Sequence, residues 1–318
     1  MKKLPLQTTA FKYLEKSYGE WLDILGYAPS TVRAFPVYVR EFLYYLEQQG
    51  KTRIQDIDIP VITTYYRALS QRANQRQGGG LSNNYLNTHL NALDRLLEYL
   101  RKQARVAIPP TRIPKEVPNP VEVLPLTQAQ VRSLYAAVDT LLEAREQGPP
   151  RSDRPALALR DKAILSVFYG CGLRRSEGEH LDLSDLHYEN RLLEVRQGKG
   201  GKPRFVPMSL GTLAHLQNYH YEGRPALLKA PTEAFFLNCR GERARGHLFN
   251  RRLKDLQRYS DDTALRHMPL HLHILRHSIA THLLYQGMSL ENVSRFLGHY
   301  TLESTQVYTH LTEQAYGK

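Results

Sequence analysis

The sequence predicts a mainly α-helical protein with one small β-sheet, an α+β fold divided into two domains. Apolar residues recur at helical spacing through most of the chain. A strand-like alternation replaces this spacing only around residues 191–209. Six prolines fall between Pro109 and Pro125, and so proline-rich a segment resists both helix and sheet. We therefore expect a helical domain, a linker and a second domain at residues 1–108, 109–124 and 125–318.

The N-terminal domain is predicted to be a bundle of amphipathic helices. The pattern places these helices at residues 8–26, 29–50, 59–72 and 81–103. Ser30 or Thr31 is expected to cap the second helix, and Ser82 the fourth. Pro36 lies inside the second pattern and should kink that helix or move its start, because proline lacks a backbone N–H group.

The C-terminal domain is predicted to combine helices with one hairpin. Helical spacing marks residues 126–145, residues 154–173 and the chain from His271 onward. Thr127 is expected to cap the first of these helices. Leu193 and Val195 precede a Gly-Lys-Gly-Gly-Lys turn, and Phe205 and Val206 follow it, which is typical of a β-hairpin.

The charge balance favours a polyanionic partner. Lys and Arg outnumber Asp and Glu by 43 to 31, a net charge of +12. Residues 1–118 hold 17 basic and 10 acidic residues, a net +7, and the remainder holds 26 and 21, a net +5. Nucleic acid or an anionic membrane surface would suit this surplus, and a merely solvated basic surface is the alternative. Because both halves are basic, we expect both to contact such a partner.

The sequence does not predict a secreted or membrane protein. No apolar run approaches the roughly 18 residues that a membrane-spanning helix needs. The N-terminus carries two lysines without an apolar stretch behind them, unlike a secretory signal. Cys171 and Cys239 form neither a metal-binding spacing nor a disulfide framework. We expect a reducing, cytoplasmic location and no membrane partner.

Four short clusters carry residues that could perform chemistry. In chain order they contain Arg174 and Arg175, then Lys199, then His273, Arg276 and His277, and finally His299 and Tyr308. Each cluster alone has an ordinary explanation: an arginine pair is usually solvated, a lysine in a Gly-rich turn belongs to the turn, and one tyrosine among 20 usually packs in a core.

A metal site is the first alternative for the histidines. His273 and His277 are four residues apart, a spacing that places two imidazoles on one face of a helix, and His271 lies nearby. No neighbouring carboxylate or cysteine completes a ligand set, and the stretch lacks the glutamate of zinc proteases. We predict no metal and no cofactor.

Together, the four clusters resemble the tyrosine recombinase (phage integrase) superfamily, and its Xer-type site-specific recombinases in particular. The matching boxes are G-L-R-x-S-E at 172–177, G-K-G at 198–200, H-x-L-R-H at 273–277, and L-G-H followed by Y-T-H at 297–310. The resemblance is strong over 125–318, and the N-terminal helices look like the family's SAM-like core-binding domain by pattern only. It implies that the two domains form a C-shaped clamp on DNA.

The resemblance implies a role for each matched residue. Tyr308 is the nucleophile that forms a 3′-phosphotyrosyl link, His273 accepts its proton, and Lys199 protonates the leaving 5′ oxygen. Arg174, Arg276 and His299 stabilise the charge that grows on the phosphate, while Glu177 and His277 support them. Guanidinium groups suit this task because each can offer a planar pair of N–H donors to phosphate oxygens.

The same resemblance implies the partners. The expected substrate is double-stranded DNA with a short inverted-repeat core site, bound by a dimer per site and by a tetramer in synapsis. Only about ten residues precede the first predicted helix, so no arm-binding domain or arm sites are expected. The predicted DNA contacts are Arg33, Arg40 and Arg95 in the first domain and Arg175, Lys202 and Arg204 in the second.

Two other functions remain open alternatives. A type IB topoisomerase uses the same active-site set to relax supercoils, although the N-terminal four-helix segment favours a recombinase. A catalytically silent DNA-binding protein is the other, and all six predicted catalytic positions are occupied by the expected residue types. The sequence leaves open whether a bacterial, phage or mobile-element gene encodes the chain, and whether the reaction serves integration, excision, inversion, transposition or resolution.

Overall fold

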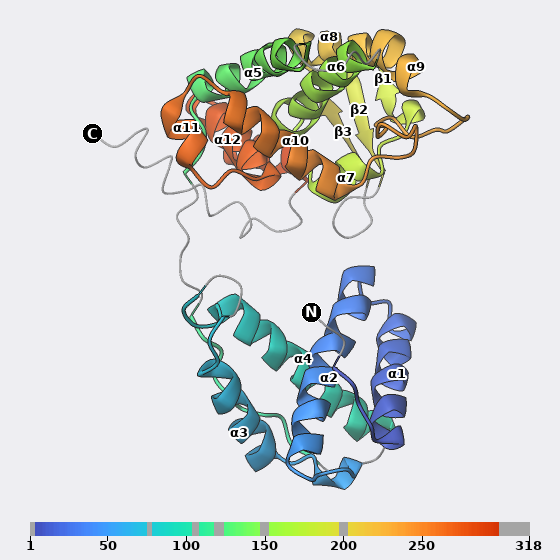
Figure 1. The fold of residues 1–318 in the computed structure, drawn as a ribbon, viewed down its shortest axis with the longest axis vertical. Coiled ribbons are helices and arrows are strands. Elements are labelled where there is room, and N and C mark those ends of the chain that lie inside the picture. The colour runs from blue at the N-terminus through green and yellow to red at the C-terminus, as the bar shows by residue number, and fades with distance from the viewer. Residues whose placement is uncertain are drawn as a thin grey trace. The chain divides into compact units, whose positions relative to one another are not determined.

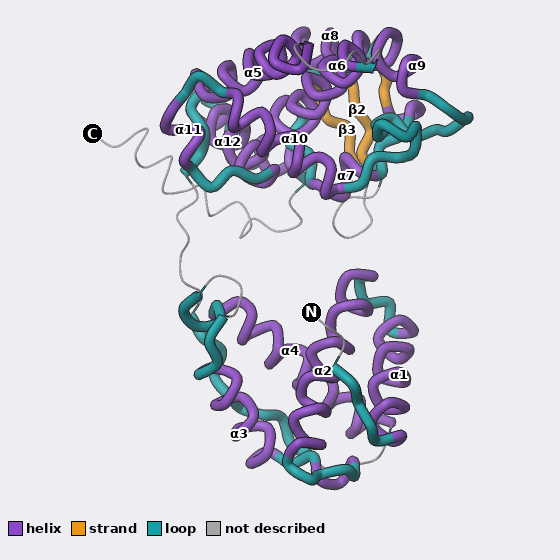
Figure 2. The backbone as a smooth tube through the Cα atoms, viewed as in Figure 1, coloured by secondary structure: helices purple, strands orange, loops and turns teal. Residues whose placement is uncertain are grey.

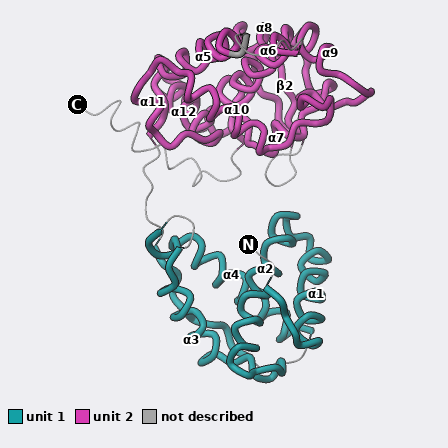
Figure 3. The backbone as a smooth tube through the Cα atoms, viewed as in Figure 1, with its two compact units in different colours: residues 1–121 teal, residues 122–318 magenta. Residues whose placement is uncertain are grey.

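The protein contains two compact units, residues 1–121 and 122–318 (Figure 3). The computed structural model describes residues 4–74, 78–103, 108–117, 124–146, 153–196 and 203–298. Helices dominate both units, and the strands lie in the second (Figures 1 and 2). None of the helices in these ranges is long and apolar enough to cross a membrane.

The first unit is built from the four predicted helices. They are α1 (Thr9–Ile24), α2 (Pro29–Gln48), α3 (Ile59–Ser70) and α4 (Asn83–Gln103). Their apolar stripes meet in one core that includes Phe11, Leu22, Phe42 and Leu93, all fully buried. Tyr18 adds a polar tie, because its buried hydroxyl donates to the Ala92 carbonyl at 3.1 Å.

Helix α2 corrects the predicted cap, and Pro36 does not move its start. It begins at Pro29, so neither Ser30 nor Thr31 is its cap, and it continues through Pro36. Proline at the first helical position needs no N–H partner, which favours this start. The Pro36 ring packs against α1, where a Cβ atom on Gly19 would lie only 3.3 Å from its Cγ. A glycine opposite a proline lets the two helices approach closely.

Two predicted caps are confirmed. The Ser82 Oγ accepts the Tyr85 backbone N–H at 3.3 Å, at the start of α4. Thr127 accepts the Gln130 N–H at 3.1 Å, and the Gln130 side chain accepts the Thr127 N–H at 3.0 Å. This reciprocal capping box starts the first helix of the second unit, α5 (Gln128–Glu146).

The second unit continues with α6 (Arg154–Leu165). Beyond α6, the predicted helical run goes on as a π-helical turn at Ser166–Gly170. The other elements, in chain order, are α7 (Arg175–Glu179), β1 (Leu186–His187), β2 (Leu192–Val195), β3 (Arg204–Pro207), α8 (Leu210–Asn218), α9 (Arg224–Leu227), α10 (Gly246–Tyr259), α11 (Thr263–His267), α12 (Leu272–Tyr285) and α13 (Leu290–Leu297). Short 3₁₀ or π-helical turns lie at Ile54–Asp56, Leu183–Asp185 and Tyr219–Gly223.

The predicted hairpin forms the larger part of a three-stranded antiparallel sheet, ordered β1-β2-β3. Leu193 pairs with Val206 and Val195 with Arg204, so the apolar pair faces the core. The third strand, β1, has two residues, too few for an alternating pattern to reveal it. The turn at 197–202, which contains Lys199 and Lys202, lies outside the described residues.

Helix α12 brings distant parts of the second unit together. It contacts the π-helical turn at Ser166–Gly170, α10 and α13, and α10 in turn contacts α7. The segments around Arg174, Arg276 and Leu297 therefore become neighbours, although about 120 residues separate the first from the last.

Candidate active site

The structure describes half of the six predicted catalytic positions. Arg174 caps the start of α7, while His273 and Arg276 lie on the first turns of α12. The two predicted supporting residues, Glu177 and His277, are also described, and both are buried. Lys199, His299 and Tyr308 lie outside the described part of the chain.

Glu177 is the centre of this site. Its carboxylate accepts the Arg174 backbone N–H at 2.8 Å and the Arg174 Nη1 at 2.8 Å. Arg204 approaches as a fork, with Nη1 on Oε1 and Nη2 on Oε2, each at 2.9 Å. The Arg276 Nη1 lies 3.9 Å from Oε2. One carboxylate, whose side chain is 1% exposed, thus holds three arginines around it.

The electrostatics of this cluster favour an anion. Burial alone would raise the pKa of Glu177, but the hydrogen bonds and charge of Arg204, followed by Arg174, outweigh it and lower the pKa to about 2. Glu177 is therefore ionised at neutral pH, and it offsets one of the three positive charges. The remaining surplus of two charges in a partly buried place attracts a group such as phosphate.

The same three arginines cap the last helix of the described chain. Arg204 Nε donates to the Phe296 carbonyl at 3.2 Å, Arg276 Nη2 to Leu297 at 2.7 Å, and Arg174 Nη2 to Gly298 at 3.1 Å. These carbonyls form the C-terminus of α13, where the helix dipole favours cations. The cluster therefore fixes the backbone directly before His299 in the sequence.

Two glycines of the predicted boxes make this arrangement possible. Gly172 has φ +60°, and a Cβ atom there would lie 2.9 Å from the Leu297 Cδ2. Gly298 has φ +65°, and its Cβ atom would lie 2.7 Å from the Arg204 Cδ. The Gly172 carbonyl also accepts Arg276 Nη1 at 2.5 Å. Both positions need a left-handed backbone and empty space, which only glycine supplies without strain.

We predict that Gly172→Ala destabilises the protein more than Gly287→Ala. Gly287 has φ +88°, and a Cβ atom added to it would meet nothing within 4 Å, so its substitution isolates the backbone cost of about 1–2 kcal/mol. Gly172→Ala adds overpacking against Leu297, roughly 1–3 kcal/mol more. Denaturant-induced unfolding of the full chain measures both values, and equal losses would contradict the packing argument.

His273 lies one helical turn before Arg276. Its side chain reaches the surface, yet partial burial, followed by the charges of Arg276, His271 and Arg174, lowers the pKa of its imidazole below the ordinary 6.5. The ring is therefore neutral at neutral pH, as a proton acceptor must be. His271 is its neighbour, with ring centroids 6.4 Å apart. In the described ranges, no three His, Cys, Asp or Glu side chains gather as metal ligands.

Some arginines among the predicted DNA contacts are exposed, and others are buried in ion pairs. Arg33 and Arg175 are exposed, and Arg95 pairs with Glu98 while remaining about half exposed. Arg40 is instead largely buried in an ion pair with Glu15 at 2.5 Å. The last two candidates are Lys202, which no described range includes, and Arg204, which is committed to the Glu177 cluster.

Arg204, a predicted DNA contact, points into the unit. The sequence did contain a signal for its inward direction. Arg204 stands two residues before Val206 on β3, and side chains two apart on a strand share one face. Because Val206 is fully buried, Arg204 also points into the unit and there meets Glu177.

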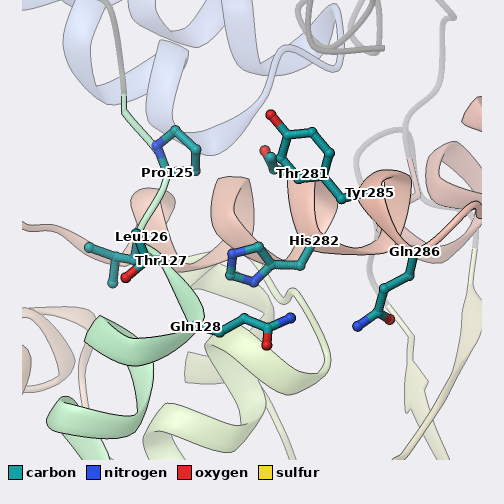
Figure 4. A pocket seen from close by; sticks show the side chains of 8 residues that line it. All are labelled: Pro125, Leu126, Thr127, Gln128, Thr281, His282, Tyr285 and Gln286. Carbon is teal, nitrogen blue, oxygen red and sulfur yellow. The ribbon is translucent and has the colours of Figure 1, made fainter. Parts of the chain in front are cut away.

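A separate pocket of about 340 Å³ lies between the start of α5 and the C-terminal half of α12 (Figure 4). It is lined by Pro125, Leu126, Thr127, Gln128, Thr281, His282, Tyr285 and Gln286. The His282 ring is fixed by a 2.8 Å hydrogen bond between its Nδ1 and the Tyr169 hydroxyl. The lining of this pocket is mostly apolar and includes none of the three clustered arginines, so we do not place the anion site there.

Comparison with known proteins identifies the family. The sequence model of the phage integrase family matches residues 125–315, more than half of the chain. The chain belongs to the phage integrase family. This confirms the resemblance that the four boxes predicted, and members of this family, the tyrosine recombinases, cleave and rejoin DNA.

Several curated members of the phage integrase family are similar over most of the chain. Tyrosine recombinase XerC 2 of Ralstonia nicotianae is 31% identical over 307 residues, covering 95% of this chain and 82% of its own length. Tyrosine recombinase XerC of Oceanobacillus iheyensis is 33% identical over 310 residues, covering 93% and 91%. Tyrosine recombinase XerD of Pseudomonas putida is 36% identical over 225 residues, covering 70% of each chain. These relatives favour a recombinase over a topoisomerase or a silent DNA-binding protein.

Solved structures of the phage integrase family share the fold. The XerH site-specific recombinase bound to palindromic difH substrate aligns with TM-score 0.68 and 19% identity, covering 96% of this chain and 82% of that one. The Tn1549 transposon integrase in complex with transposon right end DNA aligns with TM-score 0.64 and 19% identity, covering 96% and 95%. The predicted fold class, mainly α with a small sheet, is confirmed.

Proposed function

We propose that this chain is a site-specific DNA recombinase that cleaves and rejoins DNA strands through a covalent link between a 3′ phosphate and Tyr308. The observation that supports this most directly is the assembly of Arg174 and Arg276 around the buried, ionised Glu177. Such an assembly in a phage integrase family member suits a reaction that builds negative charge on a phosphodiester.

The proposed cleavage step balances as a transesterification. The Tyr308 phenolic oxygen attacks phosphorus, a new O–P bond forms, and the bond from phosphorus to the 5′ oxygen breaks. His273 takes the phenol proton, and Lys199 gives a proton to the departing 5′ oxygen. Arg174, Arg276 and His299 stabilise the charge on the non-bridging oxygens.

The same chemistry in reverse completes strand exchange. A 5′-hydroxyl from another strand attacks the phosphotyrosyl link, restores a phosphodiester and frees Tyr308. Covalent nucleophilic catalysis thus divides one exchange into two reversible transfers. The phosphotyrosyl bond keeps the energy of the original diester, so this route needs no ATP. Arg174 and Arg276 take the place of a metal ion in offsetting the charge on the phosphate.

Each unit is given a part in this proposal. Residues 1–108 form the core-binding domain, 109–124 the linker and 125–318 the catalytic domain, and both domains contact DNA. Arg33, Arg95, Arg175 and Lys202 remain candidate phosphate contacts. The excess of basic residues in both halves supports this assignment.

The proposed substrate is double-stranded DNA with an inverted-repeat core, bound by one dimer per site and a tetramer in synapsis. Related complexes give this support: one holds XerH on a palindromic substrate, and another is a lambda integrase dimer bound to a core site. Because the substrate is DNA and the similar proteins are bacterial Xer recombinases, we place the chain in the cytoplasm of a bacterial cell.

The test uses a nicked suicide substrate that carries the core site. We expect the full chain to form an adduct that survives denaturing detergent, without added ATP or divalent metal. After cleavage, the short strand between the scissile phosphate and the nick dissociates. Its 5′-hydroxyl is then no longer available for religation, so the phosphotyrosyl link accumulates. Relaxation of any supercoiled plasmid by the monomer, without a preferred site, would instead favour the topoisomerase alternative.

The lowered pKa of His273 predicts how the rate of DNA cleavage changes with pH in the acid range. Because burial and neighbouring cations lower the pKa of its imidazole below 6.5, single-turnover cleavage should be constant around neutral pH. Cleavage should then fall as the pH drops through this lowered pKa and the ring becomes protonated. His273→Gln should slow cleavage by roughly 10²–10⁴ and remove this acid limb.

The control for this profile is His282→Gln. His282 lies on the same helix and burial lowers the pKa of its imidazole too, but it contacts Tyr169 and not the arginine cluster. This variant should keep the acid limb. An acid limb that persists unchanged in His273→Gln would assign the titration to another group.

A further inference from the structure

We infer that Arg204 is a positioning residue for DNA cleavage, which holds Glu177 and the end of α13 so that Arg174 and Arg276 face the scissile phosphate. This inference rests on the proposed function. It replaces the expectation that Arg204 contacts DNA itself.

The donors of Arg204 are already engaged. A guanidinium has five N–H groups. Arg204 uses one Nη1 and one Nη2 group in its fork to Glu177, and its Nε group on the Phe296 carbonyl. Its side chain is 11% exposed. Few donors and little surface remain for a phosphate, so a DNA contact is a poor explanation for this arginine.

The hydrogen bonds of Glu177 show what Arg204 contributes. Each carboxylate oxygen accepts one bond from Arg204 and one from Arg174. Arg276 stays 3.9 Å away from this carboxylate and instead donates to the Gly172 and Leu297 carbonyls. Arg204 thus supplies charge compensation that would otherwise have to come from the two guanidiniums proposed to bind phosphate.

Removal of Arg204 would redirect these two guanidiniums. A buried carboxylate that loses a paired cation is strongly destabilised. The nearest remaining cations are Arg174 and Arg276, and Arg276 needs to move by only about 1 Å to reach hydrogen-bond distance. That movement draws it from its two carbonyls and from the phosphate. Misplacement on this scale lowers a reaction rate by about 10²-fold.

Arg204 also joins three parts of the unit. It stands on β3 opposite Val195, in the strand pair nearest the connection between β2 and β3. Its fork reaches Glu177 on α7, and its Nε group reaches Phe296 on α13. Gly298 leaves room for this side chain, because a Cβ atom there would meet the Arg204 Cδ at 2.7 Å. The hairpin, α7 and α13 are thereby held in one geometry.

The test separates cleavage from DNA binding. Single-turnover adduct formation is measured for Arg204→Gln at saturating protein on the nicked substrate, and DNA affinity is measured over a series of salt concentrations. We expect cleavage to fall about 10²-fold. Affinity and its salt slope should remain those of the unsubstituted chain, because a lost phosphate contact would reduce the slope by about 0.9.

Two further variants sharpen this test. Arg204→Lys keeps the charge but loses the fork, so its cleavage rate should lie between those of Arg204→Gln and the unsubstituted chain. Arg252→Gln is the matched control, because Arg252 is 8% exposed and its buried carboxylate partner is Asp161 instead of Glu177. It should lose stability, while its folded fraction cleaves at the unsubstituted rate.

Two outcomes would overturn the inference. One is an Arg204→Gln variant that cleaves saturated DNA at the unsubstituted rate. The other is weaker binding with a reduced salt slope and normal cleavage, which would make Arg204 a DNA contact. If Arg204→Gln does not fold, the Arg204→Lys comparison decides. Failure of the unsubstituted chain to form any adduct would contradict the proposed function instead.

Discussion

Tyr308→Phe is expected to bind DNA as tightly as the unsubstituted chain and to form no covalent adduct. The substitution removes one oxygen, the atom proposed to attack phosphorus, and keeps the aromatic ring. The charged groups proposed to bind phosphate, Arg174 and Arg276 among them, are unchanged, so affinity should be preserved. Gel analysis of the nicked substrate under denaturing conditions measures the adduct, and a mobility shift measures binding.

The 20 tyrosines of the chain provide a matched control for this result. Tyr285 is exposed at the end of α12 and lines the pocket beside His282, away from the arginine cluster. Tyr285→Phe should therefore form the adduct at the unsubstituted level. An adduct that persists in Tyr308→Phe would assign the nucleophile to another residue, and mapping the linked peptide would identify it.

Arg276→Gln is expected to slow cleavage by roughly 10²–10³, the usual effect of removing one preorganised donor from a site where charge develops. Arg276 is the largest side chain that is almost fully buried in the described chain. Its guanidinium bridges the Gly172 and Leu297 carbonyls while lying 3.9 Å from Glu177. Glutamine is neutral and shorter, so it can neither bind phosphate as a cation nor join both carbonyls.

A stability loss should accompany this kinetic effect. Each buried carbonyl left without a donor costs about 1–3 kcal/mol. Thermal unfolding measures this loss, and cleavage is therefore compared at a temperature where both proteins are folded. Arg258→Gln is the control, because Arg258 is 78% exposed and lies as far as 4.0 Å from its partner Asp255. A folded Arg276→Gln variant that cleaves at the unsubstituted rate would remove Arg276 from the mechanism.

The helices were predictable because their signals are local. A repeating apolar stripe marks each helix of the first unit. The capping residues Ser82 and Thr127 mark where α4 and α5 begin. Pro36 does not end α2, although proline often ends a helix, and its ring packs against Gly19 of a neighbouring helix. That contact depends on tertiary packing and is not visible in the local sequence.

The sequence predicted which residues belong to the active site, but not all the contacts between them. The four boxes named Arg174, Glu177 and Arg276 as members of one site. Nothing in the spacing of the boxes connected Arg204 with Glu177, which lies 27 residues earlier. The strand alternation before Val206 indicated its inward direction, but choosing its partner required the packed positions of β3 and α7.

One carboxylate shared by three arginines has a consequence for how such a chain can change over generations. The connections between β3, α7, α12 and α13 can lengthen or shorten without disturbing the shared contact, because loop closure depends weakly on length. The identities of Glu177, Arg204 and Arg276 have no such freedom, since a substitution at any one of them alters the hydrogen bonds or charge that hold the other two. Related chains can therefore diverge widely in spacing while these positions change only in concert.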